Sequence, residues 1–228
     1  MKRAIIVFLM MTTAIAVSQK TIQPTVSVTG EGIIKTVPDE VTITVQVENK
    51  GTEPKALKKK NDKTIDAILS FLKGMKVDKK DIITQYVRLQ KTYDYQTKTY
   101  SFIANQSVLI KLKDLSKYET VMSGLLANGI NRIDGINFSS SKDKELKMQS
   151  RKLAMQNAKI KAEEYAGVLN QTIGKAITIS EFSSYNQPPV MYTEASVRMV
   201  NDSNSSEQTL SVGILEIRST INVVFELN

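Results

Sequence analysis

The chain has 228 residues, of which 41% are hydrophobic and 24% charged, so it is long enough for one good-sized folded domain or two small ones. It contains no Cys, His or Trp, which excludes thiol nucleophiles, disulfides, histidine general bases and the usual zinc sites. Its formal net charge is +8, and such an excess favours either an acidic partner or, more commonly, Lys-rich helix faces in solvent.

Residues 1–18 have the pattern of a secretory signal peptide. Lys2 and Arg3 form a positive start, residues 4–11 are an unbroken apolar run, and residues 14–16 supply the small side chains of a cleavage site. The run is shorter than the ~20 apolar residues of a transmembrane helix. An uncleaved amphipathic anchor is the alternative. We therefore expect a protein that is exported to the periplasm and has no stable transmembrane anchor.

The next part of the chain predicts two strands and a helix. Residues 22–35 predict a strand with a Gly-Glu-Gly kink at residues 30–32. Apolar and polar residues alternate over residues 41–47 with the period of two that a half-buried strand has. A helix follows, which we expect Thr52 to cap and Gly74 to end.

Residues 81–95 and 99–113 predict a hairpin that is rich in aromatic residues. These are Tyr86, Tyr93, Tyr95, Tyr100 and Phe102. Packing across a pleated surface is the simplest interpretation, and stacking on bases or sugars is the alternative. The helix before the hairpin carries a lysine cluster that we expect to form a solvated face, with contact to phosphates as the alternative. Its members are Lys58, Lys59, Lys60 and Lys63.

A short helix and a strand come next. Asp114 or Ser116 starts the helix, and Ser116 with Glu119 fits a capping box. Residues 130–139 then predict a strand, because they hold apolar side chains between turn residues.

The longest predicted helix spans residues 144–170, and we expect Ser141 or Asp143 to cap it. Small residues recur every four positions and form one apolar stripe, which would let the helix backbone come close to strands. They are Ser150, Ala154, Ala158, Ala162 and Ala166. Larger side chains flank the stripe on the same, buried side of the helix, namely Leu146, Leu153, Tyr165 and Leu169. The simplest interpretation of this face is packing in the core.

The C-terminal part predicts two strands, at residues 172–185 and 215–227, and the second should be central in its sheet. Between them, residues 186–208 are polar and predict a long loop. The apolar residues 190–192 inside this loop suggest a docking segment or simple packing of the loop.

The order of elements predicts an α+β fold of strand–helix–strand units, with largely antiparallel sheets and helices packed mainly on one face. We expect one domain over residues 22–228. Two sub-lobes, about 22–113 and 114–228, are one interpretation of its internal organisation.

Known catalytic motifs are weak in this chain. Ser70 and Lys73 have the Ser-x-x-Lys spacing, but the accompanying motifs are missing and chance explains the match. Adjacent carboxylates at residues 163–164 do not face one another on a helix. We therefore nominate no catalytic, cofactor-binding or metal-ligating residue.

Several short motifs, in order, resemble the SIMPL-domain family, which includes periplasmic immunogenic and oxidative-stress-defence proteins. They are VSVTGEG at 26–32, Pro38-Asp39, DIITQ at 81–85, GINRIDGINF at 129–138, the alanine ladder with Tyr165, and EIRSTINVVFEL near the C-terminus. The family often has Pro-Gly where this chain has Val212-Gly213. The resemblance implies an α+β fold, export to the cell envelope and a non-enzymatic role, and some relatives look like ring-forming oligomers.

Three functional hypotheses follow. The first is an exported envelope protein that acts by homo-oligomerisation or by contact with an envelope protein, in stress defence on the family resemblance, with no cofactor and no nucleic-acid partner. Its expected contact elements are the loop at residues 186–208 and the sheet edges. The second is an envelope hydrolase that uses carboxylates and Tyr, which requires two facing carboxylates in a pocket. The third is an anionic-ligand-binding protein that uses the lysine cluster and the tyrosine hairpin.

Overall fold

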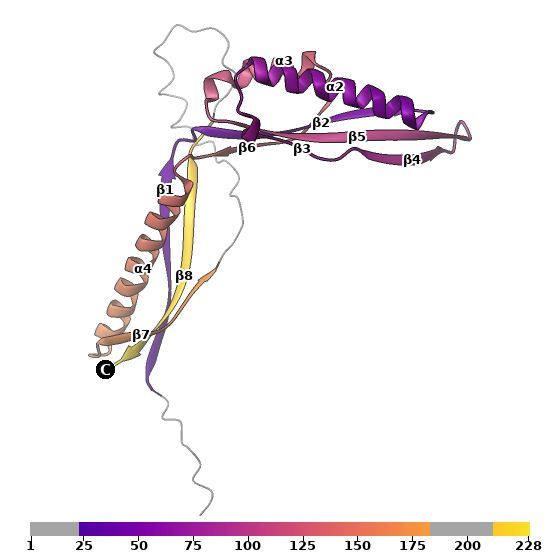
Figure 1. The fold of residues 1–228 in the computed structure, drawn as a ribbon. Coiled ribbons are helices and arrows are strands. Elements are labelled where there is room, and N and C mark those ends of the chain that lie inside the picture. Colours follow the sequence, from indigo (N-terminus) through magenta and orange to yellow (C-terminus); the bar gives the residue numbers. More distant parts are fainter. Residues whose placement is uncertain (1–22, 183–211) are drawn as a thin grey trace, which may run out of the picture.

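The computed structural model describes residues 23–182 and 212–228. They form three α-helices and eight strands in two antiparallel sheets, which confirms the α+β prediction. Figure 1 shows that two helices lie on one sheet and one helix on the other, and that the two resulting lobes extend in different directions. The predicted signal peptide and the loop at residues 186–208 lie outside the described residues.

The larger lobe is a five-stranded sheet with two helices on one face (Figure 1). Its strands are β2 (Glu40–Gly51), β3 (Ile82–Thr84), β4 (Arg88–Asp94), β5 (Thr99–Leu112) and β6 (Arg132–Ser139). Its helices are α2 (Pro54–Gly74) and α3 (Tyr118–Ala127), with short 3-10 turns η1 (Lys79–Asp81) and η2 (Leu115–Lys117). The strand order is β3-β5-β2-β6, and β4 also pairs with β5. The helices lie mainly on one face, as predicted.

The core of the larger lobe lies between the central strands and the helices. Period-two alternation places Val41, Ile43, Val45 and Val47 of β2 on the helix side, and all four are buried. The register pairs Ile43 with Ile110 of β5, so both isoleucines face the same helices. Apolar residues from α2 complete the cluster at the spacing of one helix face, namely Ile65, Ile68 and Leu72.

The smaller lobe is built from both ends of the described chain. Its strands are β1 (Thr25–Thr36), β7 (Ile173–Phe182) and β8 (Leu215–Leu227), in the order β1-β8-β7, and its helix is α4 (Asp143–Val168). The prediction that the last strand is central is confirmed. The sheets are therefore not made from residues 22–113 and 114–228, and they do not divide near Lys113. The domain organisation of the chain as a whole stays a prediction.

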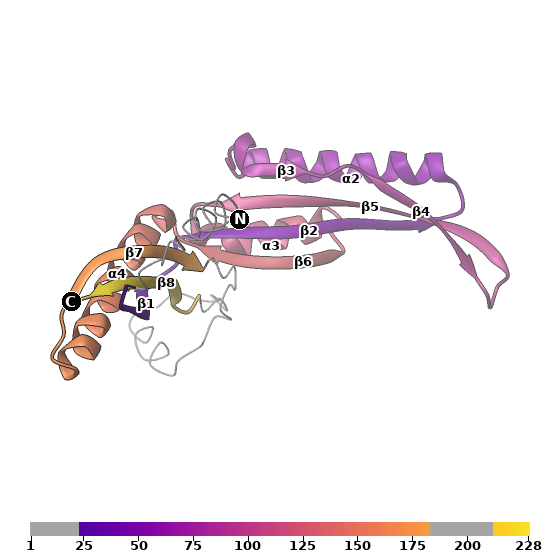
Figure 2. The same ribbon diagram turned by 90° about the horizontal axis from the view of Figure 1, so that it is seen from below.

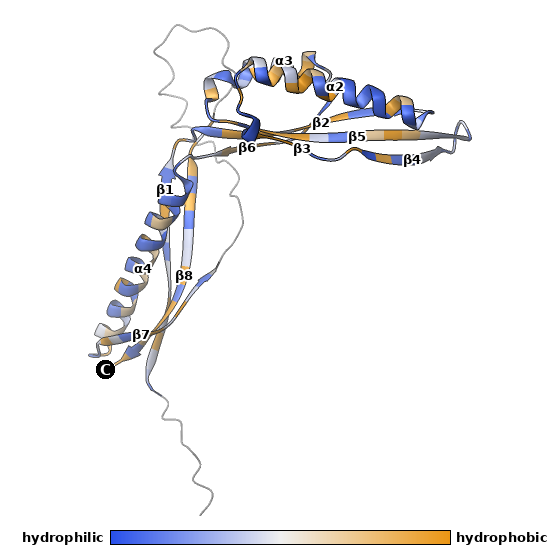
Figure 3. Cartoon of the chain, viewed as in Figure 1, coloured by the Kyte–Doolittle hydropathy of each residue, from blue (hydrophilic) through white to orange (hydrophobic). Residues whose placement is uncertain are grey.

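The alanine ladder of α4 packs on β1 and β8, as the sequence predicts. Ser150, Ala154, Ala158, Ala162 and Ala166 are all buried. The flanking Leu153, Tyr165 and Leu169 are exposed, so the prediction that they share the buried side is wrong. The buried face of α4 is narrow because its fully buried residues are all small, and most of the helix is hydrophilic in Figure 3. Met155 also packs against this core, and it remains partly exposed.

Two glycines of β1 explain how α4 comes so close. The expected kink at residues 30–32 is wrong, because β1 is continuous through them. A Cβ atom on Gly30 would lie 2.1 Å from the Ala154 carbonyl oxygen, and one on Gly32 would lie 2.0 Å from that of Ser150. The Ser150 hydroxyl also donates a hydrogen bond of 2.8 Å to the Gly32 carbonyl. These glycines are therefore needed for helix–strand contact.

Several expected helix caps differ in the structure. Glu53, and not Thr52, is the N-cap residue of α2, and Lys142 is that of α4; neither side chain caps its helix. Of the two residues expected to start the short helix, Asp114 is the N-cap of the turn η2, and its carboxylate accepts a hydrogen bond from the Ser116 amide at 3.1 Å. The strand expected at residues 81–95 is interrupted and forms β3 and β4, which both pair with β5.

Candidate functional site at the junction of the lobes

Two chain connections join the lobes within the described residues, and they lie side by side. Residues 37–39 lead from β1 to β2, and residues 140–142 lead from β6 to α4. The Asp39 amide donates to the Ser139 carbonyl at 3.1 Å, which ties one connection to the other. Any change in the angle between the lobes must pass through this junction.

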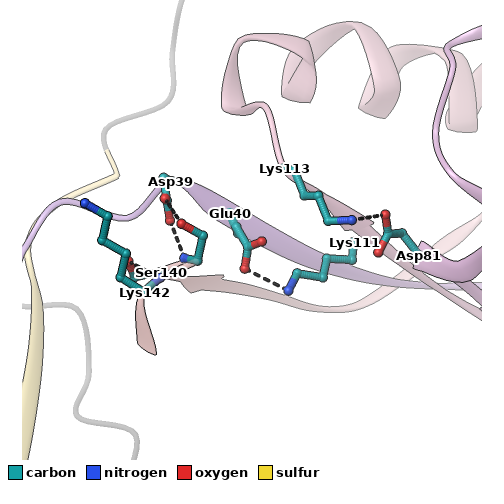
Figure 4. A network of polar contacts seen from close by, with 8 residues as sticks. Asp39, Glu40, Asp81, Lys111, Lys113, Ser140 and Lys142 are labelled. Carbon is teal, nitrogen blue, oxygen red and sulfur yellow. Dashed lines mark hydrogen bonds and ion pairs between the residues drawn. The ribbon is translucent and has the colours of Figure 1, made fainter. Parts of the chain in front are cut away.

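The Asp39 carboxylate is the main polar link across the junction (Figure 4). Its two oxygens accept hydrogen bonds from the Ser141 amide at 2.6 Å and from the Ser141 hydroxyl at 2.5 Å. These two bonds, the hydroxyl bond first, lower the pKa of Asp39 below its ordinary value of 3.8. Ser141, which was expected to cap α4, instead holds the β1–β2 connection.

Two ion pairs continue the network into the larger lobe (Figure 4). Glu40 is buried at the start of β2, and its carboxylate lies 2.7 Å from the Lys111 ammonium. Asp81 lies 2.5 Å from Lys113, and this hydrogen bond raises the pKa of Lys113. Removing Lys111 would leave the Glu40 charge buried without a partner, which would destabilise the folded protein. These pairs were missed because each joins residues far apart in the sequence.

A shallow pocket of about 530 Å³ opens beside this network, lined by Glu40, Lys111, the connection at residues 140–142 and the start of α4. Its acidic side chains have partners: Glu40 pairs with Lys111, Asp143 lies 2.8 Å from Lys147, and Glu145 accepts from Gln149 at 3.2 Å. A general acid requires a raised pKa, whereas the pKa of nearby Asp39 is lowered. The arrangement is suited to holding the two connections together.

The pH dependence of stability in the Asp39→Asn variant tests the role of the Asp39 carboxylate at the junction. Because the folded-state pKa lies below 3.8, the ionised carboxylate stabilises the folded protein above about pH 4 and loses this effect as the pH falls through the folded value. We expect Asp39→Asn to lower the free energy of unfolding by roughly 1 kcal/mol at neutral pH, and the difference from wild type to vanish in acid. Urea unfolding across pH measures it.

The control for this experiment is Asp62→Asn on α2, which removes an exposed carboxylate paired with Lys58. Exposed ion pairs of this kind contribute little to the free energy of unfolding. A pH-independent difference for Asp39→Asn, or an equal loss in Asp62→Asn, would argue against the role given to Asp39.

The other residues that the sequence singled out lie away from the junction. Lys58, Lys59, Lys60 and Lys63 are exposed on α2, as expected of a solvated face. Ser70 is exposed while Leu72 is buried, so the Ser-x-x-Lys spacing belongs to a packing helix. The tyrosine hairpin lies at the far end of the larger lobe.

Comparison with known proteins decides the family. The family model SIMPL, described as a protein of unknown function, matches residues 26–225. The chain belongs to the SIMPL family. This SIMPL protein is 27% identical to the uncharacterized protein YggE of Escherichia coli (strain K12) over 210 residues, which cover 90% of this chain and 83% of that protein. It is 21% identical to the 26 kDa periplasmic immunogenic protein of Brucella melitensis over 219 residues, with 92% and 88% covered.

The match covers both lobes and the junction of the SIMPL protein, from the second residue of β1 to near the end of β8. Within residues 23–182 and 212–228, no helix has the length and apolar character needed to cross a membrane. The same part of the chain holds no group of three or more acidic residues placed to bind a metal ion.

Proposed function

We propose that this protein works in the periplasm without catalysing a reaction, by assembling with a second copy of itself. The periplasmic location is supported by the Brucella relative, which is named a periplasmic protein, and by the signal pattern of residues 1–18. A role in stress defence is carried only by the family resemblance. The observation that carries the assembly is the outer edge of β7.

β7 is an edge strand with one unpaired side. It pairs with β8, and no other described strand pairs with it. Helix α4 packs mainly on β1 and β8. At β7, the Arg151 guanidinium lies 2.8 Å from Glu181, and Ile173 packs against the cluster that contains the α4 alanines. Ile177 and Ile179 are consequently 52% and 58% exposed. An open edge with apolar side chains is a ready template for another strand.

The sequence of β7 is complementary to itself. If two copies pair antiparallel about Thr178, the register places Lys175 of one copy opposite Glu181 of the other, and Ile177 opposite Ile179. The register of β7 against β8 shifts between Ala176 and Thr178, so the new ladder would also be irregular at Ile177. Opposite charges and paired β-branched residues across strands are both stabilising. A two-fold symmetric contact of this kind uses the same surface on both subunits, which is the commonest form of homo-oligomer. We therefore assign a second copy as the partner of this edge.

The absence of catalysis in this proposal is supported by composition and by the junction. The chain has no His and no Cys, and the acidic groups around the junction pocket each have a cation or a donor beside them. A hydrolase would need two free carboxylates that face each other. The hydrolase is therefore the weaker hypothesis.

Lysine in place of Ile179 tests the proposed edge. Its charge would fall within the apolar centre of the paired strands, so we expect the assembly to dissociate, with its mass falling to that of one chain. The matched control is Ser180→Lys, because Ser180 pairs with Asn222 and faces the opposite side of the sheet from Ile179. Light scattering of the wild type and both variants at equal concentration gives the result. Assembly that survives in Ile179→Lys, with both variants folded, would count against β7.

A further inference from the structure

The β4–β5 hairpin projects beyond the helices that cover its sheet. Gly51 at the end of β2 is paired with Phe102 of β5, and Phe102 is paired with Lys91 of β4. Past this row, β4 and β5 continue alone to the turn at residues 95–98, and Figures 1 and 2 show the hairpin extending past the start of α2. The tip is therefore a free projection of the larger lobe.

Three tyrosines form a packed and exposed cluster at this tip. The Tyr93 ring centroid lies 5.1 Å from that of Tyr95 in an edge-to-face arrangement and 4.8 Å from that of Tyr100. The rings nevertheless remain 39%, 85% and 58% exposed for Tyr93, Tyr95 and Tyr100. A tyrosine has an apolar body and a polar hydroxyl, so it suits the boundary between water and an apolar phase.

Two lysines, Lys91 and Lys98, lie beside this tyrosine cluster. The Lys91 ammonium lies 3.9 Å from the Tyr100 ring centroid, and Lys98 is in the turn itself with a φ of 54°. The nearby Asp94 carboxylate accepts hydrogen bonds from the Gln96 and Thr97 amides at 2.9 and 3.1 Å. It keeps its negative charge, so the two lysines and this carboxylate together carry a net charge of +1.

Helix α2 extends the basic surface from the same end of the sheet. It begins three residues after Gly51 and has no acidic residue in its first turn. Lys55 and Lys59 in its first two turns are exposed, and Lys58 is exposed and paired with Asp62 at 2.6 Å. Charge complementarity therefore calls for an anionic partner at this end of the molecule.

We propose that the tip of the β4–β5 hairpin binds an anionic lipid surface, with the tyrosine cluster at the headgroup level and the lysines against the lipid charges. This inference is independent of the assembly through β7, which lies in the other lobe. Each Lys or Arg near an anionic bilayer strengthens binding by about fivefold. The tyrosines add apolar contact that a purely basic surface does not have.

The ring geometry favours a lipid surface over a nucleic acid. Base stacking needs free aromatic faces, but the three rings lie edge-on or tilted to each other, and one face of Tyr100 is covered by Lys91. Packed rings flanked by lysines offer an apolar surface with positive charge at its border, which suits the headgroup region of an anionic bilayer. A nucleic-acid partner is kept as an outcome of the test.

Vesicle co-sedimentation of the exported protein tests the charge. Vesicles of phosphatidylglycerol and phosphatidylcholine are expected to bind the wild type, and vesicles of phosphatidylcholine alone to bind it weakly. Lys91→Gln combined with Lys98→Gln should weaken binding to the anionic vesicles by about 25-fold. The same double variant should keep the native mass of the wild type, which separates this proposal from assembly.

An introduced tryptophan tests the location. The chain has no Trp, so Tyr95→Trp gives a single reporter at the tip, and Tyr165→Trp gives a matched exposed reporter on α4 in the other lobe. Anionic vesicles should shift the Tyr95→Trp emission to shorter wavelength and leave the Tyr165→Trp emission unchanged.

Four results would overturn the proposal. They are no binding to anionic vesicles, equal binding to neutral ones, a shift at both reporters or only at Tyr165→Trp, and a Tyr95→Trp shift produced by a single-stranded oligonucleotide but not by vesicles. The last result would assign the tip to nucleic acid.

Discussion

Alanine in place of Gly32 is expected to destabilise the smaller lobe by about 3 kcal/mol, at the upper end of the usual range for overpacking. The new Cβ would lie 2.0 Å from the Ser150 carbonyl oxygen and 2.6 Å from the Ala154 amide nitrogen, both on the backbone of α4. A backbone atom cannot swing aside as a side-chain end can, so the whole helix must shift. Thermal or urea unfolding and hydrogen exchange along α4 measure the effect.

The control is Gly167→Ala on α4. Nothing lies within 4 Å of the added Cβ at Gly167, and Ala favours helix over Gly by about 1 kcal/mol, so this variant should be slightly stabilised. Equal behaviour of Gly32→Ala and Gly167→Ala would show that the close approach of α4 to β1 does not hold in solution.

The second large effect is expected for Ile43→Ala in β2. Ile43 is fully buried between α2, α3 and the sheet, so truncation removes apolar contact and leaves a cavity. We expect a loss of about 3–4 kcal/mol in the free energy of unfolding. The apolar clusters of the two lobes share no residue, so hydrogen exchange should rise in β2 and β5 more than in α4.

Thr44→Ala is the matched control for Ile43→Ala, because Thr44 is the next residue of β2 and faces the side of the sheet that the helices leave open. Its substitution should change the unfolding free energy by less than about 1 kcal/mol. A loss in Thr44→Ala as large as that in Ile43→Ala would mean that the assignment of the two faces is wrong.

Periodicity explains why the elements themselves could be predicted. The alternation in residues 41–47 and 215–227 and the four-residue spacing of Ala154, Ala158 and Ala162 are local patterns, and each specifies both an element and its buried face. β2, β8 and α4 follow these patterns. The fold class could therefore be read from the sequence.

Long-range pairing explains most of what could not be predicted. β1 pairs with β8 almost two hundred residues later. The glycines of β1 face α4, so the residues next to Gly32 in the sequence do not indicate that it contacts a helix. Ser141 looks like a cap by local rules, but Asp39 competes successfully for its hydroxyl and amide. The Glu40–Lys111 pair arises only once β2 and β5 are in register.

The exposure of Leu153 and Tyr165 on α4 also depends on contacts with distant parts of the chain. Leu153 and Tyr165 share the helix with the alanine ladder, and sequence spacing alone placed them beside the buried stripe. The sheet beneath α4 is narrow, because the helix covers β1 and β8 and makes little contact with β7. The width of a buried face depends on the partner surface, which the sequence of the helix does not encode.

Native mass spectrometry of the exported wild-type protein is the most direct measurement for the account as a whole, which holds that this chain works by assembling with itself. The full chain has a mass of 25.4 kDa. Self-assembly through β7 predicts an assembly at an even multiple of the mature chain's mass that persists on dilution through the micromolar range. A single chain at every concentration, with the fold intact, would contradict it.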